Sequence, residues 1–329
     1  MITPIKSKWK NPIMTERIFV LGTRKSQLAL WQANYVGNLL QQKYPGFQFR
    51  LKTFVTTGDI KLDQPLPEIG GKGLFTEELE QSLLNRTIDF VVHSLKDLPV
   101  DDTPGLSITA IPVRENPKDV LIAKEDHTLM SLPQGAKVGT SSLRRGAQLL
   151  HTRPDLELLP LRGNVDTRIR KAMNEEYDAI ILAAAGVYRL RLQEYVREEL
   201  SFDLMLPAPG QGALAIQSRK NDKVLNSILS LIEDANTRNA VVAERSLLKN
   251  LGGGCSAPVA AYAYAQGDTL YLDGLVASVD GKELMRINGT CKNETDQAAQ
   301  LGKVLAVGLI RRGAQTLLNP AKDSKNAVR

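Results

Sequence analysis

Short apolar runs of strand length alternate with amphipathic helical segments along most of this chain, and this alternation restricts the fold more than any other sequence feature. Near the N-terminus, residues 17–22, 47–57 and 89–94 have strand patterns. Helical patterns cover the segment that follows Ser26, a suitable N-cap, and residues 76–86. Strands and helices in this order predict an α/β unit with a largely parallel sheet.

A second unit of the same kind begins after residue 113. Strand patterns cover 119–123, 136–140, 156–163 and 177–186, and helical patterns cover 141–152 and 164–176, with Ser141 or Ser142 as the first N-cap. The run 211–219 is expected to return as a strand to the first domain. From about residue 235 the pattern becomes one helix, three strands joined by tight Gly-Asp and Asp-Gly turns, and a last helix at about 294–312.

These patterns predict three domains. Domain 1 comprises 17–112 and 209–233, domain 2 comprises 113–208, and domain 3 comprises 234–329. The expected fold class is α/β, with two periplasmic-binding-protein-like α/β domains hinged around a cleft and a small α+β C-terminal domain. Residues 1–16 form a leader to which the sequence assigns no function.

The charge balance favours an anionic partner. The formal net charge is +6 and the pI is about 9.2, which suits nucleic acid, an acidic membrane or a polyanionic small molecule, although a charge of this size also simply maintains solubility. The N-terminus lacks the apolar core of a signal peptide, and no apolar run has the roughly 20 residues of a membrane span. We therefore expect a cytoplasmic protein without a membrane partner.

Arginines recur where predicted strands end and helices begin. In an α/β fold, ligands bind at the carboxyl ends of parallel strands, and basic residues at a helix start oppose the helix dipole, so these arginines need an anion. The alternative is a solvated basic face. The arginines concerned are Arg24, Arg144, Arg145, Arg162, Arg168 and Arg189, the last placed just past the strand at 177–186.

Several other ligand classes lack their sequence signatures. Gly73 occupies the position where a phosphate-binding P-loop needs a hydroxyl, and no G-x-G-x-x-G opens a helix. No DNA-reading motif accompanies the basic residues, so nucleic acid is not expected as a partner. The three histidines are scattered without ligand spacing, so no metal site is expected.

Two further features have a structural and a functional interpretation. Lys96-Asp97 follows the apolar run 89–94 directly; it is either a surface ion pair or a strand-end group in which Asp97 shuttles a proton or stabilises a cation. Cys255 follows three glycines; it is either a small buried side chain or an accessible sulfur suited to covalent attachment. Cys291 has no such setting, and we interpret it as structural or exposed.

Ten stretches of the sequence, taken together and in this order, resemble the porphobilinogen deaminase (hydroxymethylbilane synthase) family. They are GTRKSQLALWQ, TTGDIKLDQPL, GGKGLFTEELE, DFVVHSLKDLP, RENPKDVLI, VGTSSLRRGAQL, LRGNVDTRIRK, AIILAAAGVYRL, PGQGALAIQ and AERSLLKNLGGGCSAPVAAYA. They span nearly the whole chain from about residue 17 to 312. The small departures, such as Glu77 where a lysine is common, lie outside the positions that the family uses for chemistry.

The resemblance implies a transferase of tetrapyrrole and heme biosynthesis. Such enzymes condense four molecules of the substrate porphobilinogen into the linear hydroxymethylbilane and release ammonia at each step. The chain grows on a dipyrromethane cofactor held by a thioether, here implied at Cys255. The family also implies a monomer and a mobile lid at residues 56–75.

Individual residues take roles from the same resemblance. Asp97 is implied as the catalytic carboxylate that assists loss of ammonia and stabilises positive charge, with Lys96 beside it in catalysis and cofactor contact. The implied cofactor-binding residues also include Ser94, Thr140, Ser141, Arg144, Arg145, Arg162, Arg168 and Arg189. The implied substrate-binding residues are Arg24, Ser26, Gln32 and Phe75, whose ring is placed to stack on a pyrrole.

The principal alternative is a hinged two-domain anion-binding protein without catalysis, because such proteins share the expected architecture. Proteins of that kind are usually exported, and they have no need of a cysteine preceded by three glycines. A basic nucleic-acid binder is a third interpretation, and it predicts a DNA affinity that falls steeply with salt.

Overall fold

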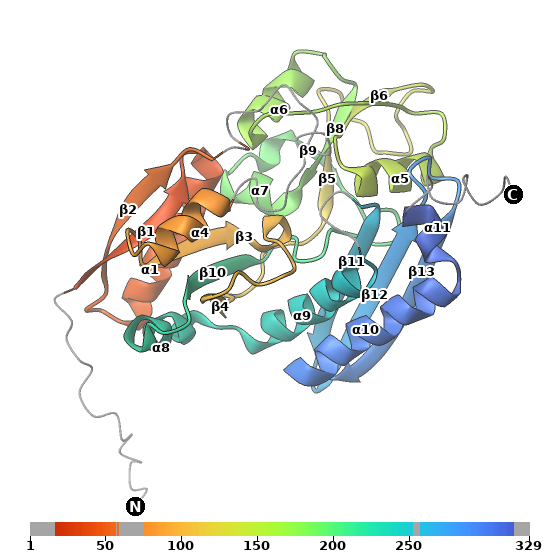
Figure 1. Cartoon of the computed structure of the whole chain (residues 1–329). Coiled ribbons are helices and arrows are strands. Elements are labelled where there is room, and N and C mark those ends of the chain that lie inside the picture. Colours follow the sequence, from red (N-terminus) through yellow and green to blue (C-terminus); the bar gives the residue numbers. More distant parts are fainter. Residues whose placement is uncertain (1–16, 57, 59–75, 253–256, 319–329) are drawn as a thin grey trace, which may run out of the picture.

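The computed structural model describes residues 17–56, 58, 76–252 and 257–318. These residues form three sheets, which we call the first, second and third sheet, each with its own helices (Figure 1). The expected fold class is confirmed: two units are α/β and the third is a small α+β unit. The leader 1–16, Phe75, Cys255 and nearly all of the implied lid lie outside the described residues.

The first sheet has the strand order β2-β1-β3-β10-β4. β1 pairs in parallel with β2 and β3, whereas β10 runs antiparallel to β3 and β4, so the prediction of a largely parallel sheet with a returning strand is correct. The strand β4 had no counterpart in the prediction. The elements are β1 (Ile18–Arg24), α1 (Gln27–Lys43), β2 (Gln48–Phe54), α4 (Glu77–Leu84), β3 (Phe90–Ser94), β4 (Leu106–Ala110), β10 (Leu214–Arg219), α8 (Lys223–Leu229) and the 3-10 turn η3 (Ser230–Ile232).

The second sheet repeats this plan with the order β7-β6-β8-β5-β9, and β5 is its reversed strand. The elements are β5 (Asp119–Ile122), β6 (Lys137–Gly139), α5 (Leu143–Thr152), β7 (Glu157–Leu159), α6 (Val165–Met173), β8 (Ala179–Ala183), α7 (Ala184–Arg189), the 3-10 turn η2 (Gln193–Tyr195) and β9 (Val196–Glu199). The prediction of one strand over 177–186 was wrong at its end. The strand stops at Ala183, and residues 184–189 form α7, because alanines without β-branches continue readily as helix.

Two stretches, which we call the crossing segments, connect the first and second sheets. The first, 111–118, runs from β4 to β5, and the second, 205–213, leads from β9 towards β10. They touch at Gly212, whose carbonyl accepts a hydrogen bond from the Glu115 amide at 3.2 Å. Gly212 has φ +86°, and a Cβ there would lie 2.4 Å from the Glu115 carbonyl oxygen, so this close approach requires glycine.

The third sheet contains β11 (Val259–Gln266), β12 (Thr269–Ala277) and β13 (Leu284–Lys292), all antiparallel. The helices α9 (Ala235–Asn250) and α10 (Thr295–Arg311) lie along one face of it, and α11 (Ala314–Leu318) follows (Figure 1). Leu247 of α9 and Leu272 of β12 belong to the fully buried core between them. The three strands and the helices α9 and α10 were predicted, whereas α11 was not.

A buried ion pair fixes the third sheet to both crossing segments. Glu244 of α9 is fully buried and accepts from Arg114 of the first crossing segment at 2.6 and 3.1 Å. It also accepts from the backbone amide of Gly210 in the second crossing segment at 2.6 Å and from that of Ala263 in β11 at 2.8 Å. All three units therefore meet at one carboxylate. Across the described ranges, no helix combines the length and the apolar character that crossing a membrane requires.

Candidate functional site

The strand β3 delivers Lys96 and Asp97 to the place where the three units meet. Its residues 90–93 are buried, and the chain then turns through the 3-10 helix η1 (Leu95–Asp97). Leu95 is fully buried and anchors the turn, whereas Asp97 is exposed. From α9, Arg245 donates to the carbonyls of Leu98 at 2.9 Å and Pro99 at 2.6 Å. The turn is therefore fixed from two sides while its carboxylate faces outward.

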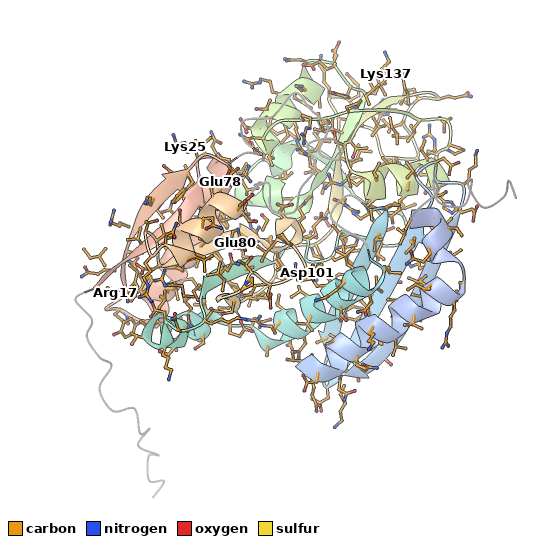
Figure 2. The ribbon with its side chains drawn as sticks, in the orientation of Figure 1. Arg17, Lys25, Glu78, Glu80, Asp101 and Lys137 are labelled. Carbon is orange, nitrogen blue, oxygen red and sulfur yellow. The ribbon has the colours of Figure 1, made fainter. Side chains whose placement is uncertain are left out.

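Consecutive side-chain hydrogen bonds support the strand β3. His93 Nε2 lies 3.0 Å from Gln217 Oε1, and Gln217 Nε2 donates to Glu80 Oε1 at 2.7 Å; Glu80, on α4, is labelled in Figure 2. Because the amide nitrogen serves Glu80, His93 Nε2 is the donor to the amide oxygen. Burial lowers the pKa of His93 to about 4, so this imidazole is neutral near pH 7.

Lys96 is half-buried, and its amine is directed towards the second crossing segment. Its Nζ donates to Gln211 Oε1 at 3.2 Å. Burial lowers the pKa of Lys96 to about 8, although the charge of Asp97 opposes the change. The ammonium is therefore a cation held in a poorly solvated place, and an arriving anion would stabilise it.

A pocket opens beside Lys96 between the first and second sheets, with about 540 Å³ of space including its solvent-filled mouth. Its walls combine cationic groups with small or apolar ones. The lining residues are Leu28, Gln32, Ser94, Lys96, Arg145, Val165, Arg168, Leu182, Ala183, Ala185, Gly186, Arg189, Gly212 and Ala213.

Arg144 and Arg145, at the start of α5, already have an internal anion. Asp119 of β5 is fully buried and pairs with Arg144 at 2.8 Å and with Arg145 at 2.7 Å. Burial alone would raise the pKa of Asp119, but the charges and hydrogen bonds of the two arginines outweigh it and hold the pKa far below its ordinary value. The anion expected from sequence is thus supplied in part by the chain, and one net positive charge remains for a ligand.

Two further arginines complete the cationic lining. Arg168 of α6 donates from Nε to the Gly163 carbonyl at 2.7 Å, and Arg189 of α7 donates to the Gly212 carbonyl at 2.7 Å. Burial lowers the pKa of each to about 10, and for Arg168 the charges of Arg145 and Arg162 add to the effect. Like charges gathered at partly desolvated positions indicate a site for a ligand with several negative charges.

Six of the residues implied by the resemblance line the pocket, namely Gln32, Ser94, Lys96, Arg145, Arg168 and Arg189. Gln32 Nε2 donates to Ser94 Oγ at 3.0 Å, which connects α1 to the end of β3. Asp97 is not part of the lining, but its charge acts on both Lys96 and Arg168, so it lies close to the pocket.

The other implied residues that the structure describes lie at or near the ends of helices and strands. Ser26 caps α1 by accepting from the Ala29 amide at 3.3 Å. Ser141 exchanges hydrogen bonds with the Leu161 backbone at 3.0 Å, and Ser142, not Ser141, caps α5. Thr140 is buried and accepts from the Ser142 amide, whereas Arg24 and Arg162 are half-buried.

Some participants had not been identified from the sequence. Asp119 was part of an apolar strand pattern, and Gln211 was part of a glycine-rich approach to a strand. Leu28, Val165 and Leu182 form an apolar side of the pocket that suits a flat ring. The motif stretches around residues 119 and 211 contained the signal, because a charged or polar residue inside an apolar run needs a buried partner.

The arrangement fits a ligand that combines flat apolar rings with carboxylates. Arginine and lysine side chains provide donors for carboxylates, and the apolar side provides a surface for rings. Asp97 adds an exposed carboxylate at the edge. Because Asp97 is exposed, its carboxylate is accessible from solvent.

Comparisons with known proteins agree with this chemistry. Two family profiles match: "Porphobilinogen deaminase, dipyromethane cofactor binding domain" over residues 19–227 and "Porphobilinogen deaminase, C-terminal domain" over residues 239–311. A curated porphobilinogen deaminase from Syntrophomonas wolfei subsp. wolfei is 48% identical over 298 residues, covering 91% of this chain and 97% of that relative. One from Syntrophotalea carbinolica is 47% identical over 305 residues, covering 93% and 96%.

Among solved structures, the periplasmic VFT2 domain of Bordetella pertussis BvgS matches with a TM-score of 0.39 and 16% identity, over 65% of this chain and 86% of that chain. A probable amino-acid ABC transporter extracellular-binding protein from Bacillus subtilis matches with a TM-score of 0.38 and 14% identity, over 65% and 88%.

Proposed function

The chain belongs to the porphobilinogen deaminase family, and we propose that the pocket beside Lys96 is its reaction site, with Asp97 as the catalytic carboxylate. The chain is a transferase of tetrapyrrole biosynthesis. The reaction joins four porphobilinogen molecules into the linear hydroxymethylbilane and releases one ammonia for each bond. The observation that carries the residue assignment is the gathering of Lys96, Arg145, Arg168 and Arg189 around one apolar-sided pocket.

The cations bind the carboxylates of the pyrrole units. Each porphobilinogen carries an acetate and a propionate, so a chain of pyrroles gains two negative charges with every unit. The lowered pKa values of Lys96, Arg168 and Arg189 show that these cations are held at a desolvation cost, which a carboxylate partner offsets. Arg168 and Arg189 have the planar donor geometry that suits carboxylates.

Asp97 serves the step in which ammonia leaves. The departing amine must remain protonated, and positive charge develops on the pyrrole ring as the carbon–nitrogen bond breaks. A carboxylate fixed beside that ring stabilises the charge, and it then accepts the proton that the ring releases when the new carbon–carbon bond has formed. Arg245 and buried Leu95 hold the turn that presents Asp97, so its position does not depend on the ligand.

The dipyrromethane cofactor fits the same pocket. Its carboxylates need cations and its rings need an apolar surface, and the lining supplies both. We assign Arg145, Arg168 and Lys96 to hold it. When bound, the cofactor supplies the terminal pyrrole to which the first substrate is joined. Covalent attachment through a thioether at Cys255 is part of the proposal and rests on the GGGC motif, since Cys255 lies outside the described residues.

The same family membership supports four further parts of the proposal. These are a cytoplasmic location, a monomeric state, and the absence of both nucleic-acid and membrane partners.

The experiment is incubation of the purified chain with porphobilinogen, following substrate consumption, ammonia release and the mass of the product. We expect one ammonia for each porphobilinogen consumed and a product of four units. Tight binding of porphobilinogen without ammonia release would contradict the proposal and favour a hinged anion-binding protein.

A further inference from the structure

Gln211 is a polar residue in the interior of the fold, where a side-chain amide needs hydrogen-bond partners. It lies in the second crossing segment and is fully buried. Its Nε2 donates to the Pro117 carbonyl at 2.8 Å, the Lys118 carbonyl at 3.3 Å and Asp119 Oδ1 at 3.0 Å. Three acceptors around one amide nitrogen fix the orientation of the amide group, so Oε1 must point the other way.

The opposite side of this amide faces the reaction site. Lys96 Nζ donates to Gln211 Oε1 at 3.2 Å. One side chain therefore links a cation of the first-sheet unit to Asp119 at the start of the second-sheet unit. Asp119 in turn holds Arg144 and Arg145, so the contacts run without a break from Lys96 to the arginine pair.

We propose that Gln211 is a positioning residue. Its amide fixes the position of the Lys96 ammonium relative to Asp119 and the arginine pair Arg144 and Arg145, across the junction of the two α/β units. Gln211 does not belong to the lining of the described pocket, whereas its neighbours Gly212 and Ala213 do. It therefore acts through Lys96 and not by touching the substrate. The proposal rests on the proposed function only for the role of Lys96 in catalysis.

The charged surroundings of Lys96 determine what loss of this contact does. Burial and the charges of Arg145 and Arg144 favour the neutral amine, whereas Asp97 and Asp119 favour the ammonium. Arg168 and Arg189 line the same pocket. The amide oxygen of Gln211 accepts a hydrogen bond from the charged form, so its removal makes the ammonium harder to maintain. A hydrogen bond to a charged group corresponds to a change of about 1 pH unit or more.

The test measures Lys96 directly. Trace acetylation of the purified protein across a pH series, with the peptide containing Lys96 quantified by mass spectrometry, gives the midpoint at which this amine becomes reactive. In Gln211→Met, which has similar length but no donor and only a weak acceptor, we expect the midpoint to fall by about 1 pH unit relative to the parent. An unchanged or higher midpoint overturns the proposal.

Gln217→Met is the matched control. Gln217 is also buried, and its amide also bridges two side chains, His93 and Glu80, but it does not contact Lys96. We expect a comparable loss of stability and an unchanged Lys96 midpoint. A fall equal to that of Gln211→Met would mean that general loosening is responsible, and would also overturn the proposal.

A second variant keeps the test decisive if Gln211→Met does not fold. Gln211→Glu retains an acceptor for Lys96, so its midpoint should stay at or above that of the parent; a lower midpoint contradicts the proposal. Steady-state turnover of porphobilinogen is a second measurement. Gln211→Met should lower kcat by a larger factor than it raises KM. The acetylation result needs no turnover, so a parent that fails to consume porphobilinogen refutes the proposed function and leaves the test of Gln211 intact.

Discussion

Asp119→Asn removes one charge from the centre of the cation cluster and changes almost nothing in shape. The carboxylate of Asp119 is fully buried and receives donors from Arg144, Arg145 and Gln211. Both arginines are themselves buried, with 4% and 7% exposure. The asparagine variant leaves two guanidinium groups in a poorly solvated place without their counter-ion, and that is the dominant cost.

The size of this cost follows from the burial. Removing one partner of a buried ion pair destabilises a protein by about 3–5 kcal/mol, and we expect about 3 kcal/mol because the amide oxygen still accepts hydrogen bonds. Unfolding entropy is about 2.1 cal/mol/K per residue. For a chain of 329 residues, about 3 kcal/mol then corresponds to a fall in Tm of about 4 °C.

The pH dependence of the free energy of unfolding gives an independent check that Asp119 is stabilising. The pKa of Asp119 is lowered in the folded protein, so its stabilising effect is present above the unfolded pKa of about 3.9 and is lost as pH falls through the lower folded value. Between about pH 5 and pH 6, where Asp119 is ionised in both states and Lys96 has not begun to titrate, the difference in stability between the parent and Asp119→Asn should therefore be constant.

Thermal and urea unfolding of the purified proteins measure both effects. Asp155→Asn is the matched control, because Asp155 also receives two hydrogen bonds from one arginine, Arg153, but in a half-buried pair that solvent reaches. The free energy of unfolding should fall clearly less in Asp155→Asn than in Asp119→Asn, since solvent screens a pair that it can reach. Equal losses from the two variants, or an Asp119→Asn variant as stable as the parent, would refute the account of a charge cluster built around Asp119.

Three further substitutions test other parts of the structure. Asp97→Asn should reduce porphobilinogen turnover by about 100-fold or more while Tm stays within about 1 °C, because the side chain is exposed; an active variant would contradict its catalytic role. Gly212→Ala should lower the free energy of unfolding in urea by at least about 1 kcal/mol more than Gly135→Ala. Both glycines have positive φ, but only at Gly212 would a Cβ lie 2.4 Å from a backbone atom, so equal costs would contradict the close approach. Glu244→Gln should cost about 3 kcal/mol in the same assay, and a loss below about 1 kcal/mol would show that the buried pair with Arg114 does not hold the units together.

The strand and helix order was predictable because apolar periodicity is local. The return of 214–219 to the first sheet was predictable too, since a short apolar strand after a glycine-rich stretch needs a sheet to join. The strands 106–110 and 196–199 were missed. Each has polar residues at positions that lie at a sheet edge, so its apolar pattern is weak even though backbone pairing makes it a strand.

The site was predictable in its charges but not in its connections. Arginines after strand ends pointed to an anion, and family motifs pointed to Asp97 and Lys96. The sequence could not show that Asp119 neutralises part of the arginine pair, because residues 119 and 144 meet only when β5 and α5 pack together. It could not show the bond from Lys96 to Gln211 either, since the two lie 115 positions apart. Partners of buried polar groups are set by tertiary packing, which local patterns do not encode.

The most direct test of the central claim is the intact mass of the denatured protein, with the modified residue mapped by peptide fragmentation. The account predicts a mass excess of two porphobilinogen units less two ammonias, located on Cys255, in the protein as purified or after incubation with porphobilinogen. Cys255→Ser should remain unmodified under both conditions. A chain that stays unmodified after incubation with porphobilinogen, or one that carries the added mass on Cys291, would contradict the account.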